Sequence, residues 1–312
     1  MKEEVRASER SAARRLPLTV IVPTYNEEAT LEACLESVRF ADEILVVDSF
    51  STDRTLEIAR RLGVRILQHE YVYSARQKNW AIPRASHDWI LLVDSDERVP
   101  PELRDEILGI LSGTPEHDGY WIRRANHFLG KRIRRCGWGT DAVIRLFRRD
   151  VARYQDREVH AEIELPGRLP TLQHKLDHHS FRSFGQYFRK LQLYSDWGAA
   201  QLYKEGRRAG ALQILGRPMT RFLKMYILRL GFLEGLHGLV LSMLGAFTVY
   251  LKYARLWEMS LGGGTEHLPQ RVAAAGPLVE EQIGRMMDEE RERRAPVPAP
   301  GPGGARPGPP RP

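Results

Sequence analysis

The chain contains 312 residues and carries a formal net charge of +7, because 47 lysine and arginine residues outnumber 40 aspartate and glutamate residues. Hydrophobic residues make up 42% of the sequence, which excludes a chain that is disordered throughout and allows one large domain or two ordinary ones. The two cysteines, Cys34 and Cys136, form no Cys-x-x-Cys motif, which excludes a disulfide scaffold and a zinc ribbon and favours a reducing compartment. No apolar run precedes Leu16, so we expect no secretory signal.

Short apolar runs alternate with longer charged segments in the first hundred residues. We expect strands at 18–23, 43–49, 64–69 and 89–96, and helices at 27–38, 52–62 and 74–85. Strands that are apolar without interruption are typical of parallel strands covered by helices on both faces. The order therefore predicts a Rossmann-like α/β fold with a central, mostly parallel sheet, in which ligands bind at the carboxyl ends of the strands.

The rest of the chain changes character twice. A helix at 102–111 leads to strand-like pieces at 119–124 and 142–149, and from residue 183 onward the pattern is helical, with aromatic and basic residues interleaved. The last fifty residues are rich in glycine and then in proline, which is typical of disorder. The pattern predicts four regions: an N-terminal extension (1–16), the α/β domain (17–180), a helical basic-apolar region (181–261) and a largely disordered tail (262–312).

Acidic residues follow three of the expected strands. Glu27 comes after the first strand, Asp48 ends the second, and Asp94 and Asp96 end the fourth. Parallel geometry brings these strand ends to one edge of the sheet, where carboxylates repel one another unless a cation or hydrogen-bond donors lie between them. A divalent ion that carries a diphosphate fits this edge best.

The Asp94-Ser95-Asp96 spacing suits a hard ion. Mg²⁺ or Mn²⁺ takes oxygen ligands from one or two carboxylates, from water and from phosphate. We expect Asp96 to contact the metal directly, and Asp94 to contact a ribose hydroxyl, a metal-bound water or the metal. An isolated Asp-x-Asp is more often a solvated turn, but this one follows a buried strand.

Other residues near this edge have two interpretations each. Arg76 and Lys78 begin the third expected helix, where they face either a diphosphate or solvent. Asp48 either stabilises the N-terminus of the next helix or accepts a hydrogen bond from a nucleobase N–H. Glu27 could simply cap the first helix.

Three motifs together carry a resemblance. The segments VIVPTYNEEATLEACLESV, ILVVDSFSTDRT and WILLVDSDERV resemble, in order and spacing, those of the family 2 inverting glycosyltransferases, which have the glycosyltransferase A fold. The later segments GWGTDAVIRLFRRD, EVHAEIEL and HHSFRSFGQYFRKLQLYS are similar to those of bacterial lipopolysaccharide core enzymes that add glucose to an inner-core heptose. The resemblance implies that residues 17–180 are the catalytic domain.

The resemblance also implies roles for single residues. Pro23, Tyr25 and Glu27 match the motif that holds the base and ribose, and Asp48 matches the aspartate that reads uracil or another base. Asp94 and Asp96 match the pair that binds ribose, metal and diphosphate. The sequence departs from the family at the catalytic base, where Gly139-Thr140-Asp141 stands for the usual Glu-Asp, and at Val159-His160-Ala161, where the narrower group has Val-His-Glu.

An inverting transfer is one in-line displacement, which needs a general base on one side and a cation at the leaving diphosphate on the other. We expect Asp141 to be the base, with Asp156 and Glu158 in reserve; the alternative is that Asp141 only forms a turn before a strand. Trp138 and His160 are candidates for the acceptor side, Trp138 either stacking on a sugar ring or packing inside. The adjacent His178 and His179 point to opposite sides of an extended segment, which favours hydrogen-bonding roles over joint metal binding. The alternative is that one histidine contacts the metal or the diphosphate.

The helical region suggests a membrane surface. Residues 235–251 are apolar but shorter than the roughly 20 residues of a spanning helix. Basic residues alternate with aromatic and aliphatic ones at Arg217, Arg221, Lys224 and Arg229, as in a helix that lies in the headgroup region of an anionic leaflet. The alternative is a helical pair packed on the catalytic domain. We expect a peripheral protein at the inner, cytoplasmic face of the bacterial cytoplasmic membrane, and no nucleic-acid partner.

The sequence therefore predicts an inverting, metal-dependent glycosyltransferase that uses Mg²⁺ or Mn²⁺. The donor is a nucleotide-diphosphate sugar such as a UDP-sugar, and the acceptor is a lipid-linked saccharide of the lipopolysaccharide core or another envelope glycan. The alternatives are a polyprenyl-phosphate glycosyltransferase, whose acceptor is already ionised, and a non-catalytic nucleotide-binding membrane adaptor. A nucleotidyltransferase is disfavoured because PTYNEEAT contains no glycine.

Overall fold

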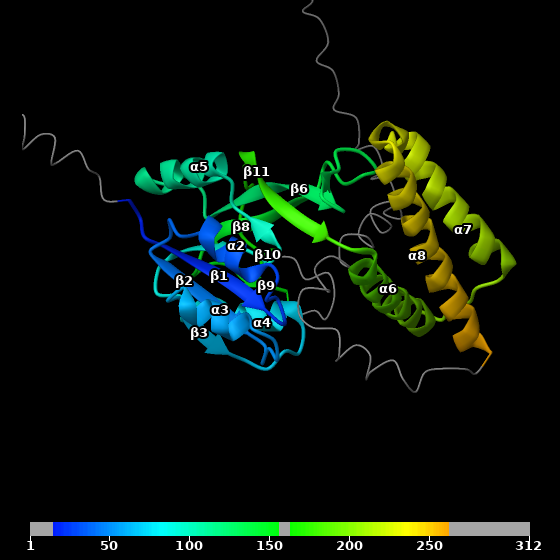
Figure 1. Cartoon of the computed structure of the whole chain (residues 1–312), viewed down its shortest axis with the longest axis horizontal. Helices are drawn as coiled ribbons and strands as arrows, with labels where there is room; N and C mark the ends of the chain where they lie inside the picture. The colour runs from blue at the N-terminus through cyan, green and yellow to red at the C-terminus, as the bar shows by residue number, and fades with distance from the viewer. Residues whose placement is uncertain (1–14, 156–162, 262–312) are drawn as a thin grey trace, which may run out of the picture.

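The computed structural model describes residues 15–155 and 163–261. Figure 1 shows an α/β half, built around a twisted sheet, beside a half made of helices. The predicted N-terminal extension lies outside the described residues apart from its last two, as does the predicted tail. The predicted α/β class is confirmed.

The strands form one large mixed sheet and one small ribbon. The large sheet has the order β3-β2-β1-β4-β8-β6-β11-β5, with β7 on the edge of β6, and β9 pairs with β10. The strands are β1 (Leu18–Thr24), β2 (Glu43–Asp48), β3 (Arg65–Gln68), β4 (Trp89–Leu92), β5 (Glu97–Arg98), β6 (Gly119–Phe128), β7 (Lys131–Arg132), β8 (Ala142–Arg148), β9 (Arg153–Tyr154), β10 (Ile163–Glu164) and β11 (Thr171–Phe181). The first four in space are parallel, whereas β8 runs antiparallel to both β4 and β6.

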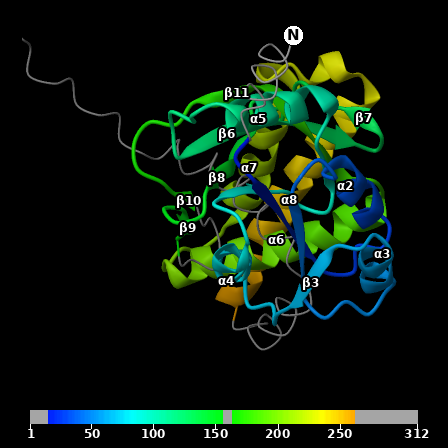
Figure 2. The same ribbon diagram turned by 90° about the vertical axis from the view of Figure 1, so that its left-hand side faces the viewer.

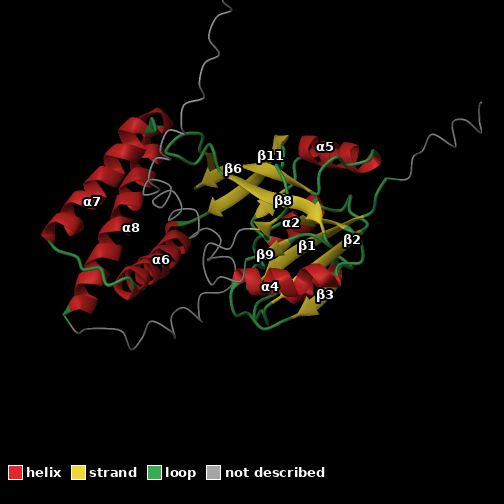
Figure 3. Ribbon diagram, turned by 180° about the vertical axis from the view of Figure 1, so that it is seen from behind, coloured by secondary structure: helices red, strands yellow, loops and turns green. Residues whose placement is uncertain are grey.

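The helices are divided between the two halves. The α/β half contains α2 (Leu31–Ser37), α3 (Thr55–Arg61), α4 (Ser74–Ala81), the short η1 (Ile82–Arg84) and α5 (Pro101–Ser112). The helical half contains α6 (Phe184–Lys204), α7 (Ala211–Leu223), η2 (Lys224–Leu228), η3 (Gly231–Glu234) and α8 (Leu236–Ser260). Figure 3 shows these last helices grouped at one side of the sheet.

Helices cover both faces of the parallel strands. Every residue of β1 is buried, and its side chains alternate between two cores. Val20 packs with Leu35 of α2 and Leu103 of α5 on one face, while Ile21 packs with Ile82 on the other. Figure 2 shows α2 and α3 on one side of β1 and α4 on the other. Burial on both faces explains why the parallel strands lack polar alternation.

The predicted elements are correct in type but differ at their ends. The strand expected at 89–96 ends at Leu92, after which Val93 N donates to Ile21 O at 3.0 Å and the acidic residues form a turn. The helix expected at 74–85 becomes a 3₁₀ turn at Ile82, next to Pro83, because proline supplies no N–H for a helical hydrogen bond. Within the region expected to be helical, α7 begins at Ala211, and the helical path is interrupted at Leu230, whose φ is 54°.

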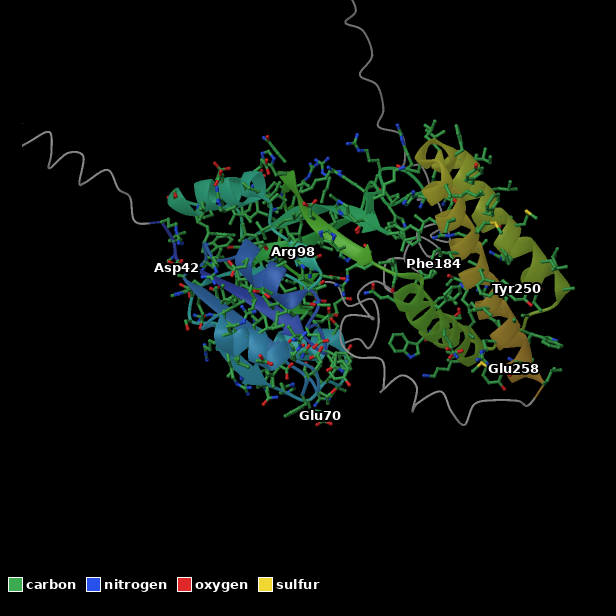
Figure 4. The ribbon with its side chains drawn as sticks, viewed as in Figure 1. Asp42, Glu70, Arg98, Phe184, Tyr250 and Glu258 are labelled. Atoms are coloured by element: carbon green, nitrogen blue, oxygen red, sulfur yellow. The ribbon has the colours of Figure 1, made fainter. Side chains whose placement is uncertain are left out.

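A shared aromatic core joins the two halves. Phe128 and Phe181, at the ends of β6 and β11, pack with Tyr187 of α6 and Leu241 of α8. Figure 4 labels Phe184 where β11 passes into α6, and Tyr250 on α8. The sheet therefore holds the first turn of the helical half directly.

The hairpin of α7 and α8 is closed by glycines. A Cβ on Gly238 would lie 1.9 Å from the carbonyl oxygen of Gly231, so α8 and η3 meet backbone against backbone. By length and composition, one described helix, α8, could cross a membrane, although part of its surface packs against α6. The predicted association with a membrane therefore stays a prediction.

Candidate active site

The first two strand ends lie side by side, as expected. Pro23 pairs with Val47 and is buried, and Tyr25, directly after β1, is half-buried. The backbone N–H of Glu27 donates to Thr55 Oγ1 at 2.8 Å, and the hydroxyl of Thr30 donates to the Glu27 carboxylate. The structure thus brings Pro23, Tyr25 and Glu27 to the predicted edge, and their contacts with a nucleotide stay predictions.

Asp48 organises the turn after β2. Its carboxylate is fully buried and accepts hydrogen bonds from Thr24 Oγ1 at 3.3 Å, Ser51 N at 3.0 Å and Gln68 Nε2 at 3.1 Å. These donors satisfy the desolvated charge within the protein. The contact of Asp48 with a nucleobase stays a prediction.

Six ionic side chains, all buried except the partly exposed Asp141, form a continuous network behind the Asp94-Ser95-Asp96 turn. In order of contact, this buried charge network consists of Lys78, Asp94, Arg145, Glu97, Arg124 and Asp141. Three cations alternate with three carboxylates. The carboxylates at this edge are therefore neutralised by the protein's own cations, and their repulsion alone does not require a metal.

Arg145 lies at the centre of the buried charge network. It is fully buried on β8 and contacts Asp94 Oδ2 and, at 3.0 Å, Glu97 Oε1. On the other side of Glu97, Arg124 Nη1 lies 3.2 Å from the same Oε1. The second oxygen of Glu97 accepts a hydrogen bond from Asp94 N at 2.9 Å. The network therefore fixes the backbone of the turn as well as its charge.

Lys78 links the network to α4. Its ammonium lies 3.9 Å from Asp94 Oδ1 and 5.2 Å from the centre of the Tyr154 ring, and the side chain is buried. Arg76, predicted beside it, is exposed and forms no ion pair within the described ranges. The structure thus brings Lys78, and not Arg76, to the Asp94 carboxylate.

Asp96 faces a histidine. His178 Nε2 lies 3.5 Å from Asp96 Oδ2, and His178 Nδ1 lies 2.6 Å from Asn126 Oδ1. The Asn126 amide nitrogen donates to Trp138 O and to Asp141 Oδ2, both at 3.0 Å, which fixes the side-chain oxygen toward His178. Ser180 Oγ also lies 3.0 Å from His178 Nδ1, so Nδ1 is hydrogen-bonded within the protein and Nε2 is the ring nitrogen that faces Asp96.

This pair of groups fits a divalent ion. A carboxylate oxygen and an imidazole nitrogen 3.5 Å apart can both reach one ion, and an imidazole whose other nitrogen is hydrogen-bonded to the protein is a typical metal ligand. No group of three or more histidine, cysteine or acidic side chains in the described part of the chain is arranged to hold a metal. The remaining ligands would be phosphate and water, as is common for Mg²⁺. Metal contact by Asp94 stays a prediction, since cations face both of its oxygens.

Asp141 sits at the other end of the network, directly before β8. Arg124 and Asn126 both donate to its Oδ2, with Arg124 Nη2 at 2.7 Å. Burial raises the pKa of Asp141, but the Arg124 guanidinium and the Asn126 amide lower it more, so the net pKa lies below the ordinary value. Because its pKa is lowered, this carboxylate is ionised at neutral pH. About 15% of its side chain is exposed, so a ligand can reach it.

The remaining predicted residues divide into two groups. Trp138 packs against Phe128 and Phe181, with ring centres 6.2 and 6.1 Å apart, which matches the packing interpretation. His178 and His179 do point to opposite sides of β11: His178 faces the site, and His179 stacks on His127. The other three predicted residues, Asp156, Glu158 and His160, lie outside the described residues.

Sequence reasoning missed three residues of the site, Arg124, Asn126 and Arg145. A signal was present, because Arg145 interrupts the apolar run AVIRLF, and Arg124 and Asn126 lie in the strand-like stretch GYWIRRANHF. A charged residue in a buried strand has to find a partner inside the protein. That partner could not be named before the strand order was known.

Comparison with known proteins identifies relatives of this chain. The sequence model described as "Glycosyl transferase family 2" matches residues 19–160. An "Uncharacterized glycosyltransferase" of Rickettsia bellii (strain RML369-C) is 30% identical over 78% of this chain and 87% of its own length. The "Lipopolysaccharide core biosynthesis glycosyltransferase LpsC" of Rhizobium meliloti (strain 1021) is 28% identical over 78% of this chain and 93% of its own length.

Among solved structures, a glucosyl-3-phosphoglycerate synthase from Mycobacterium tuberculosis, in complex with Mn²⁺, UDP-glucose and phosphoglyceric acid, superimposes with a TM-score of 0.34 at 20% identity. The match covers 49% of this chain and 63% of that one. The matches in sequence identify the family of this chain. The chain belongs to glycosyltransferase family 2.

Proposed function

We propose that this glycosyltransferase moves a sugar, with inversion, from a UDP-sugar to a hydroxyl group of a lipid-linked saccharide in lipopolysaccharide core or related envelope glycan assembly. The observation that carries the proposal is the short path from Asp96 to Asp141 through His178 and Asn126. It places an acidic group suited to a metal-diphosphate near an ionised carboxylate suited to a base. Similarity to the relative named for lipopolysaccharide core biosynthesis supports the acceptor class.

The residues divide the work of an in-line displacement. Asp96 and His178 would hold Mg²⁺ or Mn²⁺, which when bound neutralises charge on the leaving diphosphate. Lys78 supplies a buried positive charge at Asp94 on the donor side. Asp141 accepts the proton of the acceptor hydroxyl, while Arg124 and Asn126 hold its carboxylate in position. The buried charge network thus fixes the donor and acceptor groups relative to each other.

We expect Asp141→Asn to lower kcat/KM for a hydroxyl acceptor by about 10²- to 10⁴-fold, the usual contribution of a general base. The pKa of Asp141 is lower than usual, because the opposing effects of Arg124 and Asn126 outweigh that of burial. The carboxylate is therefore ionised above about pH 5, and the loss should be the same from about pH 5 to about pH 8. Transfer from a panel of nucleotide sugars to extracted membrane lipid, measured across this range, tests both statements.

The matched control is Asp118→Asn, which removes a carboxylate that is 38% exposed and paired with Arg148. It should leave kcat/KM unchanged. Unimpaired transfer by folded Asp141→Asn would overturn the assignment of the base, and absence of transfer by the unaltered protein from any nucleotide sugar would overturn the proposed reaction.

One observation favours a second acceptor class. Arg124 and Asn126 both donate to the same oxygen of Asp141, and a carboxylate whose pKa is held low is a weak base. A polyprenyl phosphate acceptor needs no base, because its attacking oxygen is already ionised. Full activity of Asp141→Asn on a polyprenyl phosphate, together with no transfer to a hydroxyl, would select this alternative.

We also propose that the protein is peripheral at the cytoplasmic face of the cytoplasmic membrane. Exposed apolar side chains repeat every three or four residues along α7 and α8, as on a helix that lies in a bilayer interface. These apolar stripes consist of Leu212, Leu215, Met219 and Leu223 on α7 and of Leu236, Leu239, Met243, Phe247 and Tyr250 on α8. No side chain of α7 is buried. Exposed apolar surface of this extent supports a lipid-facing side.

A further inference from the structure

Four basic side chains gather where β6, β7 and β11 meet, and we call Arg123, Arg132, Arg134 and Lys175 the strand patch. Lys175 lies beside Arg123 in the register of β11 and β6, and Arg132 lies opposite His127 in the register of β7 and β6. None of the four forms an ion pair with any residue in the described ranges. The strand patch therefore carries a surplus of positive charge.

The strand patch lies on the opposite face of the sheet from the candidate active site. Alternation along β6 puts Arg124, with its buried ion pairs, on one side and the exposed Arg123 on the other. Along β11, His178 faces the site, while Lys175, Asp177 and His179 lie on the side of the strand patch, where the Asp177 carboxylate offsets part of the positive charge. The catalytic machinery therefore does not use these four charges.

The charges of the strand patch act on one another. Burial, together with the guanidinium groups of Arg132, Arg123 and Arg134, lowers the pKa of Lys175. Like charges at this spacing raise the free energy of the unliganded protein, and an anionic partner would lower it.

The strand patch adjoins the apolar end of the α7–α8 hairpin. Lys131 forms an ion pair with Glu234 of η3 at 3.2 Å, and the backbone N–H groups of Arg134 and Arg135 donate to the same carboxylate at 2.8 and 2.9 Å. Cys136 N also donates to Arg229 O at 3.1 Å. Figure 1 shows this loop after β6 reaching the end of the helical half where α8 begins. The acidic group nearest the loop is thus already bound within the protein.

Large apolar side chains project from that same end. This tip consists of Leu228, Phe232, Leu233 and Leu236, which are 75%, 45%, 59% and 72% exposed. The tip continues the apolar stripes of α7 and α8 toward the strand patch. Apolar residues that can enter the acyl boundary, flanked by cations at the level of the phosphates, are the features of an anionic bilayer surface site.

We propose that the tip and the strand patch together dock the protein on a bilayer that contains anionic lipids, with the tip in the headgroup region and the strand patch on lipid phosphates. The inference rests on the proposed peripheral placement and specifies its surface. It accounts for a cationic cluster that has no ion-pair partner among the described residues and no role in transfer.

The test compares vesicle binding of two variants with equal charge. Arg132→Gln with Arg134→Gln removes two charges of the strand patch, whereas Arg39→Gln with Arg60→Gln removes two exposed charges near α2 and α3. Each charge near an anionic surface contributes about fivefold to partition, so the first variant should bind phosphatidylglycerol-containing vesicles about 25-fold more weakly. The second should bind as the unaltered protein does, and Leu233→Gln with Leu236→Gln should weaken binding to anionic and zwitterionic vesicles alike.

Equal binding by the two charge variants would overturn the proposal, as would retention on duplex DNA as strong as on anionic vesicles. Transfer to a detergent-solubilised acceptor does not require binding to a vesicle. This assay therefore tests the proposed function separately from the docking surface. Unchanged transfer with weakened vesicle binding in the strand-patch variant is the expected result. Failure of the unaltered protein to bind any vesicle would overturn the placement and the docking surface together, whatever its transfer activity.

Discussion

Replacing Asp96 with asparagine is expected to lower kcat/KM by about 10²- to 10³-fold, which corresponds to several kcal/mol of lost stabilisation of the leaving diphosphate. Asparagine keeps the size of the side chain but removes the negative charge that faces His178 Nε2 at 3.5 Å. Because asparagine is nearly isosteric with aspartate, the fold should tolerate the change.

The measurement is transfer rate with and without a chelator. The unaltered protein should lose activity in the chelator and regain it with Mn²⁺ or Mg²⁺, because an ion held by Asp96 and His178 would neutralise charge on the leaving diphosphate. Asp96→Asn should be nearly inactive under all these conditions. Asp105→Asn, which removes an exposed carboxylate of α5, is the matched control and should behave as the unaltered protein. Full activity of either Asp96→Asn or the chelated protein would contradict the metal assignment.

The parallel half of the sheet was predictable because each of its strands can be recognised from its own short run of apolar residues. Apolar runs such as 43–48 read as buried strands, and the acidic residues after them fall at one edge whatever the remaining topology is. The boundaries shifted where single residues dominate, as at Pro83, which ends the regular part of α4.

The mixed part of the sheet beyond β4 was harder to predict. β11 carries polar residues on much of its length, as in TLQHKLDHHSF, and only its alternation with Leu172 and Leu176 marks a buried face. Its partner β6 precedes it by more than forty residues and runs parallel to it. Such long-range pairing leaves little trace in a local pattern, and it is this pairing that brings His178 beside Asn126.

Long-range strand pairing also explains why the basic residues of the site were missed. The carboxylates were visible in sequence, and the expectation that they need positive charge nearby was sound. The sequence reasoning assigned that charge to a metal ion, whereas the fold places Arg145 and Arg124 among them from β8 and β6. Which cation neutralises a buried carboxylate depends on strand order, which residue types alone do not specify.

Arg145→Met should therefore destabilise the protein more than any other single change in the network. Arg145 is fully buried and contacts both Asp94 and Glu97, so its loss leaves buried carboxylates without part of their compensating charge. Removal of one partner from a buried ionic pair costs about 3–5 kcal/mol of the free energy of unfolding. Urea unfolding followed by circular dichroism measures this directly.

Arg148→Met is the control on the same strand. Its side chain is 43% exposed and pairs with Asp118 and Asp150 in solvent, so its loss should cost no more than about 1 kcal/mol. A second variant, Arg145→Met with Asp94→Asn, removes a carboxylate together with its cation and should recover part of the stability, because a buried charge without a partner is more costly than an absent pair. Equal unfolding midpoints for Arg145→Met and Arg148→Met would show that the ion pairs of Arg145 do not stabilise the fold.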